Sequence, residues 1–295
     1  MSHDLSRILL TGGNGQVGRA LRQVLPPSAT MLAPDRGVLD IAKPDSIRSV
    51  VRDFCPTLII NAAAYTAVDR AETEADLAMA VNGVAPGVLA EEAKRLNATL
   101  VHYSTDYVFD GTKSAAYTES DTPNPLSVYG KTKLAGELAV QAAGAAHYIL
   151  RTSWVYAAEG ANFMNTMLRL GRERPELRIV NDQTGAPTWA AAIAEMTMKI
   201  LGHTAAHRDD PRHGVYHCTA TGAVTWFGFA QVIFAEAAKM QDCKAPRLIP
   251  ITTAEYPLPA RRPANSRLDT SRLTANFGIV PAAWQEMLVE CLRSR

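Results

Sequence analysis

The sequence predicts an α/β fold, in which a doubly wound parallel sheet is followed by a smaller C-terminal region. Three observations support this prediction. Short apolar runs alternate with segments of helical periodicity through the first half of the chain. These runs are almost continuously apolar, which is typical of parallel strands buried on both faces. A glycine-rich turn, GGNGQVG, directly follows the first run.

The first two strand–helix units lie before residue 55. Residues 7–11 (RILLT) form the first expected strand, and the helix over 16–25 should end at Pro26-Pro27, because proline interrupts helical hydrogen bonding. A weaker strand is expected over residues 30–33. Pro44 begins the second helix, whose apolar positions recur at helical spacing up to Phe54.

The remaining units follow the same order. Three further strands and two helices are expected, with the strands at 57–61, 99–103 and 147–151, a long alanine-rich helix at 75–96 and another helix at 127–140. Alternation of strands and helices predicts a parallel sheet covered on both faces.

The strand–helix alternation becomes less regular after Trp154, where helices alternate with proline-rich connections such as residues 246–263. We therefore expect two regions that form a cleft at the carboxyl ends of the strands. Residues 1–155 plus roughly 184–220 are assigned to dinucleotide binding, and roughly 156–183 and 221–295 to substrate binding.

Composition excludes several classes of function. The net charge over 295 residues is +1 and no basic run occurs, so no nucleic-acid partner is expected. There is no stretch of ~18 apolar residues and no signal-peptide pattern at the N-terminus, so no membrane association is expected. The four scattered cysteines are interpreted as reduced thiols, and a cytoplasmic location is expected.

The glycine turn predicts a dinucleotide cofactor and hence a Rossmann-type sheet. Glycines at positions 12, 15 and 18 permit a tight turn and let the backbone approach a pyrophosphate at a helix N-terminus. The residues expected to bind the phosphates are Gly12, Asn14, Gly15, Gln16, Val17 and Gly18.

The choice between NADPH and NADH stays open. Asp35 could accept a hydrogen bond from the ribose 2′-hydroxyl of NADH, whereas Arg36 could bind the 2′-phosphate of NADPH. Both could also belong to a solvated loop. The further cofactor candidates are Asp40 and Ile41 near the adenine, and Ala62, Ala63 and Ala64, whose methyl side chains allow close approach.

A second constellation is suited to delivering a proton to a carbonyl. Tyr129 and Lys133 are four residues apart in a predicted helix, so their side chains share one face. A nearby ammonium should lower the pKa of the phenol. Thr105, at the end of a strand, could stabilise charge on the substrate oxygen. We assign these three residues as catalytic, and expect Tyr129 and Lys133 to contact the cofactor as well.

Together these motifs carry a resemblance over nearly the whole chain. The sequence resembles extended short-chain dehydrogenases/reductases and, more narrowly, is similar to the dTDP-4-dehydrorhamnose reductases. The blocks that carry the resemblance are NAAAYTAVDRAE from Asn61, HYSTDYVFDGT from His102, PLSVYGKTKLAGE from Pro125, RTSWVY from Arg151, VNDQTGAPT from Val180 and RPANSRLD from Arg262. It implies reduction of the 4-keto group of dTDP-4-dehydro-6-deoxy-L-mannose to dTDP-L-rhamnose by NADPH or NADH.

The resemblance also implies the residues that bind this nucleotide-sugar. They are Ser104, Tyr107, Trp154, Asn181, Gln183, Arg262 and Asn265. Chemistry alone makes Arg262 a reasonable diphosphate partner, because guanidinium binds phosphate oxygens in pairs. Arg261 or Arg267 could take that role instead.

No metal is expected. Some members of the family form metal-bridged dimers through acidic residues after GAPT, but this chain has Trp189-Ala190-Ala191-Ala192 there and no carboxylate before Glu195. A monomer or weak homodimer is therefore expected. His213 and His217 would be far apart on a strand and lack an obvious third ligand. The acidic run Asp69, Glu72 and Glu74 is interpreted as solvated surface.

Two alternatives remain at this point. The chain could be a nucleotide-sugar epimerase or dehydratase of the same superfamily, which would retain a tightly bound NAD. However, dehydratases place a second carboxylate after the Thr-Asp pair, and this chain has Tyr107 there. It could also be a non-catalytic regulatory subunit, as proteins of this fold that modulate methionine adenosyltransferase are. The complete Thr105, Tyr129 and Lys133 set argues against that.

Overall fold

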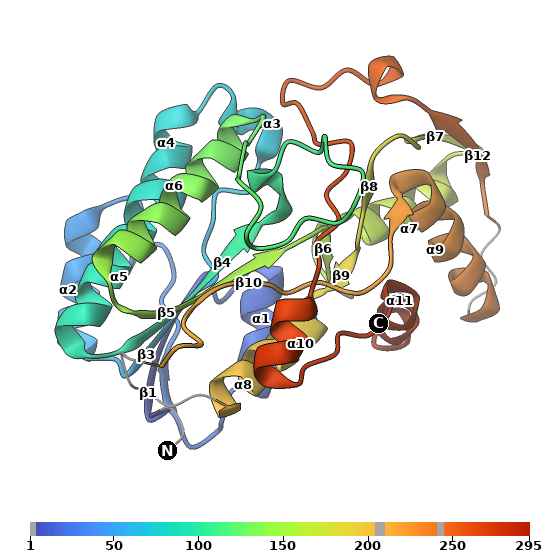
Figure 1. Cartoon of the computed structure of the whole chain (residues 1–295). Helices are drawn as coiled ribbons and strands as arrows, with labels where there is room; N and C mark the ends of the chain where they lie inside the picture. Colours follow the sequence, from blue (N-terminus) through green and yellow to red (C-terminus); the bar gives the residue numbers. More distant parts are fainter. Residues whose placement is uncertain (1–3, 204–209, 241–244) are drawn as a thin grey trace.

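The architecture is a central parallel sheet between two helical layers, with a smaller region at one end (Figure 1). The computed structural model describes residues 4–203, 210–240 and 245–295, so Cys243 lies outside the described residues. The sheet has six parallel strands in the order β2-β1-β3-β4-β5-β10. Their bounds are β1 Arg7–Thr11, β2 Thr30–Leu32, β3 Leu58–Asn61, β4 Thr99–Thr105, β5 Ala146–Thr152 and β10 Gly214–His217. The predicted α/β doubly wound class is confirmed.

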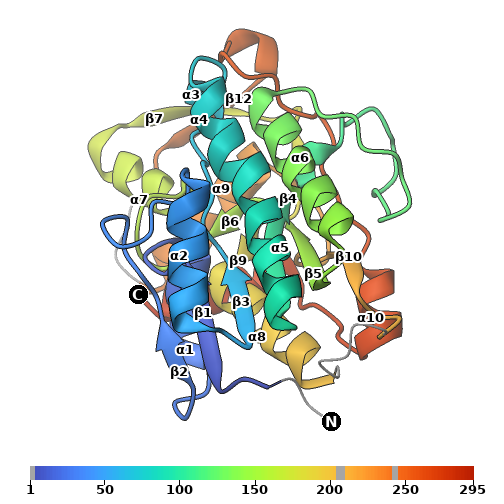
Figure 2. The same ribbon diagram turned by 90° about the vertical axis from the view of Figure 1, so that its left-hand side faces the viewer.

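Helices cover both faces of this sheet. As a result, β1, β3 and β4 are fully buried apart from the first residue of β1. One layer consists of α2 Pro44–Phe54, α5 Ala85–Leu96 and α6 Val128–Ala143, which lie side by side in Figure 2. The other contains α1 Gln16–Val24 and α8 Ala190–His203, which pack against each other. Strand order reverses between β1 and β3, and this is where open α/β sheets bind ligands.

The predicted helix over residues 75–96 is divided. After α3 Val68–Ala71, the chain forms α4 Ala75–Met79, a π-helical turn over Ala80–Val84 and then α5. Pro86 in the first turn of α5 has no N–H to continue a regular ladder. The wide turn buries Asn82, whose amide hydrogen-bonds the backbone N–H and carbonyl of Tyr65. The interruption therefore ties this helix to the loop after β3.

The smaller region has a core of its own. The strands β7 Glu176–Val180 and β12 Arg247–Ile251 pair in parallel, and α7 Phe163–Glu173, α9 Trp226–Met240 and α11 Trp284–Arg293 pack beside them. Two short pairs connect the regions, namely β6 Val155–Tyr156 with β9 Thr188–Trp189, and β8 Thr184–Gly185 with β11 Val224–Thr225. The helix α10 Ser271–Phe277 instead packs with the sheet core through Leu273 and Phe277, although residues 221–295 were expected in the smaller region.

The described part of the chain contains no helix with the length and apolarity needed to span a membrane.

Candidate active site

The glycine turn follows β1 at the point where strand order reverses. Gly12 has φ +69°, and a Cβ there would lie 2.5 Å from the backbone nitrogen of Ala63. A Cβ on Gly18 would lie 2.1 Å from the carbonyl oxygen of Gly12. Only glycine lets β1, the loop after β3 and α1 approach this closely. Gly15 begins α1 without a side-chain cap, so the first N–H groups of the helix suit a pyrophosphate.

The other predicted cofactor residues surround this turn. Asn14 is exposed, Gln16 and Val17 are part-buried, and Gln16 accepts a hydrogen bond from Asn162 of the smaller region at 3.0 Å. Ala62 and Ala63 lie against Gly12, and Ala64 follows them along the same loop. The backbone N–H donors and the small side chains around this turn therefore suit a bound dinucleotide.

At the adenosine end, the two competing residues differ in their contacts. The carboxylate of Asp35 accepts hydrogen bonds from the N–H groups of Gly37 at 2.9 Å and Val38 at 3.2 Å. Arg36 is exposed beside it. Asp40 similarly accepts from Ala42 N–H at 3.2 Å and pairs with Lys43, while Ile41 is part-buried. The Asp35 carboxylate thus binds the backbone of its own turn, whereas the Arg36 guanidinium faces solvent.

The catalytic candidates come from β4 and α6. Thr105 ends β4, and Ser127 caps α6 by accepting a hydrogen bond from Gly130 N–H at 3.1 Å. A Cβ on Gly130 would lie 2.2 Å from the carbonyl oxygen of Tyr107, so glycine lets the start of α6 approach the turn after β4. The structure thereby brings Tyr129 next to Thr105 and Tyr107.

Lys133 lies one turn further along α6, and its ammonium is buried. Its Nζ donates to the carbonyl oxygen of Tyr103 and lies 3.5 Å from Nε2 of His102. Behind His102, a buried chain continues through Asn61 to Thr11, with His102 Nδ1 3.0 Å from Asn61 Nδ2 and Thr11 Oγ1 2.6 Å from Asn61 Oδ1. Burial lowers the pKa of Lys133 to about 8.

Tyr129 differs from the sequence expectation. Burial raises the pKa of its phenol to about 12, whereas we expected Lys133 to lower it. The Lys133 ammonium is directed to the Tyr103 carbonyl instead, and it is not among the causes of the Tyr129 shift. The hydrogen bond to Thr105 lowers the pKa of Tyr129, and the charge of Asp106 raises it. The phenol is thus held in its protonated form.

Asp106 is the buried carboxyl of the site. Its Oδ1 accepts a hydrogen bond from Thr105 Oγ1 at 2.9 Å, and its Oδ2 accepts one from Ser153 Oγ at 2.9 Å. Ser266 from the C-terminal segment lies close enough to the same carboxylate to lower its pKa, although its hydroxyl donates to the Thr184 carbonyl oxygen at 3.4 Å. Burial nevertheless raises the pKa of Asp106 to about 6, because desolvation outweighs these hydrogen bonds.

A buried ion pair joins β5 to α6. Arg151 Nη2 is 2.7 Å from Glu137 Oε2, and both side chains are buried. Ser104, which we predicted to bind substrate, donates its hydroxyl proton to Glu137. The Ser104 hydroxyl is therefore engaged by Glu137 rather than directed to a substrate.

Arg262 lies beside Tyr107, which in turn packs against Tyr129. Arg262 pairs with both carboxylate oxygens of Asp69, at 3.0 Å for Nη1–Oδ1 and 2.7 Å for Nη2–Oδ2. Tyr107 lies edge-on to Tyr129, and burial raises the pKa of its phenol. Asp69 and its neighbours are thus not merely solvated surface, since Glu72 also accepts from the N–H of Val128 at 2.8 Å. That interpretation of the acidic run was wrong.

Trp154 forms a stacked pair with Trp226 of α9. The ring centroids are 3.4 Å apart and the planes differ by 3°. Trp154 has φ +47°, and its ring lies against Gly185. Gln183 accepts a hydrogen bond from Trp226 Nε1 at 3.3 Å and donates one to Thr253 at 3.0 Å. Two of the predicted substrate residues therefore meet through Trp226, which carries no motif in the sequence.

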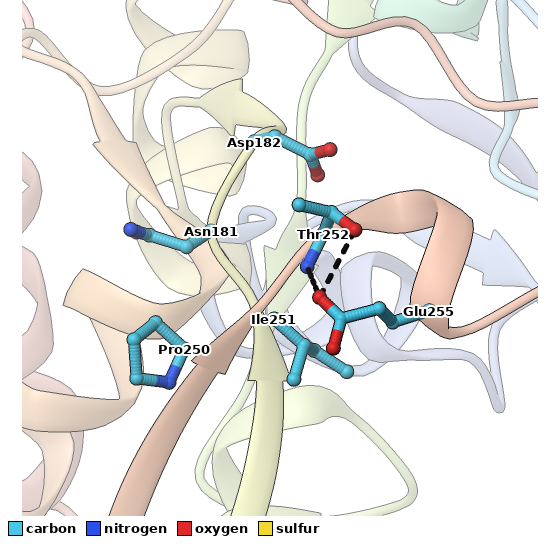
Figure 3. A pocket seen from close by; sticks show the side chains of 6 residues that line it. All are labelled: Asn181, Asp182, Pro250, Ile251, Thr252 and Glu255. Carbon is cyan, nitrogen blue, oxygen red and sulfur yellow. Dashed lines mark hydrogen bonds between the residues drawn. The ribbon is translucent and has the colours of Figure 1, made fainter.

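The remaining substrate candidates are less central. Asn181 is exposed and, with Asp182, Thr252 and Glu255, lines a shallow cavity of about 200 Å³ where β7 and β12 end (Figure 3). Asn265 uses its amide to donate to the carbonyl oxygens of Lys113 and Ala115. Arg267, an alternative to Arg262, donates to Asn265 and to the Ser114 carbonyl, which leaves Arg262 better placed beside Tyr107.

The described residues contain no group of three or more side chains arranged to hold a metal ion. His213 immediately precedes β10 and His217 ends it, and burial lowers the pKa of His217 to about 3.

Sequence reasoning missed several residues around Thr105. Asp106 was quoted only as part of a motif, Ser153 and Ser266 only within longer blocks, and Trp226 not at all. No sequence signal links Asp106 to Ser153 or Ser266, which are distant along the chain. A polar residue next to a predicted catalytic threonine was the one available hint for Asp106.

The chain matches known proteins over almost its entire length. Residues 6–295 match the family described as RmlD substrate binding domain. A dTDP-4-dehydrorhamnose reductase of Burkholderia thailandensis is 46% identical over 97% of this chain and 98% of its own length. One of Escherichia coli is 44% identical over 94% of each chain. A crystal structure of the Bacillus anthracis dTDP-4-dehydrorhamnose reductase in complex with NADP has a TM-score of 0.91, with 36% identity, and covers 99% of this chain and 100% of that one.

Proposed function

This chain belongs to the dTDP-4-dehydrorhamnose reductase family of NAD(P)-dependent oxidoreductases, and on that premise we propose that it reduces the 4-keto group of dTDP-4-dehydro-6-deoxy-L-mannose to give dTDP-L-rhamnose. The observation that most supports the proposal is the placement of a protonated phenol, Tyr129, beside Thr105 at the carboxyl end of the sheet. A bound NADPH or NADH supplies the hydride for such a reduction.

The residues of this chain supply the proton and the orientation. Tyr129 gives its hydroxyl proton to the oxygen of the 4-keto group as that oxygen gains negative charge. Thr105 holds the same oxygen in place through its hydroxyl. The ammonium of Lys133, buried against the sheet, donates to the Tyr103 carbonyl, and it would hold the cofactor ribose.

The nucleotide-sugar is held by the smaller region. The edges of the Trp154 and Tyr107 rings suit a deoxysugar, and Arg262 suits the diphosphate. Gln183 lies behind Trp226, and Asn181 and Asn265 shape the surrounding segments. We assign residues 1–155 and 184–220 to the cofactor, and 156–183 with most of 221–295 to this substrate.

A coupled assay tests the proposal. The keto-sugar is generated from dTDP-glucose by a dehydratase and a 3,5-epimerase, and loss of NADPH or NADH is followed by the absorbance of the reduced nicotinamide. Oxidation that requires the epimerase, with dTDP-L-rhamnose as product, is the expected result. The proposal would be contradicted by a folded protein that binds NADPH or NADH but does not oxidise either cofactor with this substrate.

Assembly as a monomer or weak homodimer is part of the same proposal. The segment after GAPT begins α8 with Ala190-Ala191-Ala192 and offers no carboxylate for a shared metal before Glu195. Sedimentation should therefore give the same mass with EDTA and with magnesium. A magnesium-dependent dimer would contradict this assignment.

A further inference from the structure

One loop of the smaller region contacts the helix that begins at the glycine turn. The loop, residues 157–162, connects β6 to α7, and Nδ2 of its Asn162 donates a hydrogen bond to Oε1 of Gln16 at 3.0 Å. Gln16 is the first residue of α1, directly after Gly15. A helix N-terminus that follows such a turn is where the pyrophosphate of a dinucleotide binds. The contact therefore links the smaller region to the cofactor site.

Backbone groups fix the direction of the Asn162 amide. Its Oδ1 accepts a hydrogen bond from the backbone N–H of Asn165 at 2.9 Å and so caps α7. Its Nδ2 donates to the backbone carbonyl oxygen of Ala157 at 2.8 Å. Because a backbone N–H only donates and a carbonyl oxygen only accepts, exchanging the oxygen and nitrogen of this amide would break both bonds. Asn162 therefore presents a donor to Gln16.

The loop that carries Asn162 is held in place by the first turn of α7. Asn165 donates through Nδ2 to three carbonyl oxygens of the loop, those of Ala157, Ala158 and Gly160. The loop makes a second contact with α1, in which Glu159 Oε2 lies 3.7 Å from Arg19 Nη1. Both of those side chains are exposed, and such pairs contribute little. Asn162 is thus the contact of defined direction.

The donor from Asn162 determines which end of the Gln16 amide remains for a ligand. A primary amide has one oxygen, which accepts, and one nitrogen, which carries two N–H donors. Oε1 of Gln16 is turned to Asn162, and Nε2 makes no hydrogen bond to any of the described residues. Phosphate oxygens accept hydrogen bonds, so the Nε2 end of Gln16 suits a pyrophosphate.

We propose that Asn162 is a positioning residue for the cofactor, which holds Oε1 of Gln16 so that the Nε2 N–H groups of Gln16 donate to the pyrophosphate of NADPH or NADH. Turned the other way, Gln16 would place its oxygen against the phosphate oxygens, and two acceptors repel each other. The region assigned to substrate therefore also serves the cofactor. This inference rests on the cofactor part of the proposed function and does not depend on which keto-sugar is reduced.

The test is a double-mutant cycle of Asn162→Ser and Gln16→Met, measured without substrate. Serine can still cap α7 but lacks the amide that reaches Gln16, and methionine keeps the unbranched chain of Gln16 without an amide. Fluorescence titration of the reduced nicotinamide gives the affinities for NADPH and NADH. Competition by adenosine, which has no phosphate, is the ligand control. Glu159→Gln, which removes the partner of Arg19 from the same loop, is the matched control variant.

Asn162→Ser should weaken NADPH and NADH binding by the same factor, about 3- to 10-fold, which is the effect of one well-directed hydrogen bond. Adenosine affinity, and cofactor affinity in Glu159→Gln, should stay within about 2-fold of the wild type. In the double variant the loss should equal that of Gln16→Met alone, because Asn162 acts through Gln16. A merely structural Asn162 would add its own loss to that of Gln16→Met, and this outcome would overturn the inference.

Unchanged cofactor affinity in a folded Asn162→Ser protein would also overturn the inference, and it would leave the reductase proposal intact. If Asn162→Ser does not fold, Asn162→Asp replaces it, since aspartate keeps the size and the cap but presents an acceptor to Gln16. Cofactor affinity equal to that of the wild type in Asn162→Asp would then overturn the inference, and a loss would support it. A wild-type protein that binds neither NADPH nor NADH would contradict the reductase proposal and the inference together.

Discussion

The indole of Trp154 stacks face to face on that of Trp226, with ring centroids 3.4 Å apart. Trp154 follows β5 of the large sheet, whereas Trp226 begins α9 of the smaller region, so the pair joins the two sides of the proposed sugar pocket. The positive φ of Trp154, +47°, is a conformation that bulky residues rarely adopt. The stack on one side and Gly185 on the other hold the ring in that orientation.

Replacing Trp226 should therefore disturb sugar binding without touching the reacting atoms. We expect Trp226→Leu to raise KM for the nucleotide-sugar about 3- to 10-fold, because an aromatic pair contributes roughly 0.5–1.5 kcal/mol beyond its buried area. Initial rates over a range of substrate concentrations would measure it, and kcat should change little. Trp226→Phe keeps an aromatic ring, so its KM should lie between those of the wild type and Trp226→Leu. A KM equal to that of the wild type in Trp226→Leu would refute this role.

Asp69 should control substrate affinity through Arg262. The pair has two charge-assisted contacts, and Arg262 is 17% exposed, so the carboxylate fixes the direction of the guanidinium. We expect Asp69→Asn to raise KM for the nucleotide-sugar about 10-fold, equivalent to about 1.4 kcal/mol of binding free energy. Competition by dTDP would measure the diphosphate part directly.

The control for that prediction is Asp76→Asn, which removes an exposed carboxylate from the neighbouring helix α4. It should leave dTDP affinity unchanged. Equal effects of the two substitutions would mean that net charge, rather than the position of Arg262, determines the affinity.

Tyr129→Phe should abolish turnover and spare the cofactor. Removing a general acid costs about 10²- to 10⁴-fold in rate. Single-turnover oxidation of NADPH would measure the rate, and fluorescence titration the cofactor affinity, which should stay within about 3-fold. Tyr256→Phe, at an exposed position, is the matched control. Retained turnover in Tyr129→Phe would identify another donor.

Arg36 should favour NADPH. One carboxylate oxygen of Asp35, Oδ1, already accepts from the N–H groups of Gly37 and Val38, whereas Arg36 is exposed. We expect Arg36→Ala to raise KM for NADPH about 10-fold or more and to change KM for NADH by less than about 2-fold. Arg174→Ala, which removes another exposed arginine, is the control. Equal changes for both cofactors would rule out 2′-phosphate recognition by Arg36.

The sequence predicted the sheet well because its signals are local. The strands β1, β3, β4 and β5 are short apolar runs, and the glycine turn carries its constraint within a few residues. The break in the 75–96 helix was missed, since the π-helical turn depends on Asn82 reaching Tyr65. Helical periodicity alone does not register a contact of that kind.

The site was predictable in its motif residues and not in their connections. Thr105, Tyr129 and Lys133 could be named from spacing, but Asp106 meets Ser153 and Ser266 only in three dimensions. The pKa of Tyr129 is likewise set by burial, which no spacing reveals. Long-range polar contacts of this kind decide protonation states, and they require the fold.

The Asp106 carboxyl should also make stability depend on pH. Its pKa is raised from 3.8 to about 6, so the folded protein binds this proton more tightly than the unfolded chain does. The free energy of unfolding therefore falls as pH rises from about 4 to about 6 and stays reduced above that, by about 2–3 kcal/mol for a shift of this size. Asp106→Asn lacks this titration. Relative to the wild type, it should gain about 1 kcal/mol of stability between pH 5 and pH 7.5, measured by urea unfolding at both values.

Asp110→Asn should show the opposite sign. Hydrogen bonds from Thr112, Asn124 and Tyr117 lower the pKa of Asp110, so its carboxylate stabilises the fold above the unfolded pKa, and that contribution is lost as pH falls through the folded value. Asp110→Asn should therefore be less stable than the wild type at both pH 5 and pH 7.5. If the stability difference between Asp106→Asn and the wild type were the same at both pH values, Asp106 would not be the buried, proton-binding carboxyl described above. If the two aspartates, four residues apart, have opposite effects on stability, then burial at the site, rather than the residue type, determines how stability depends on pH.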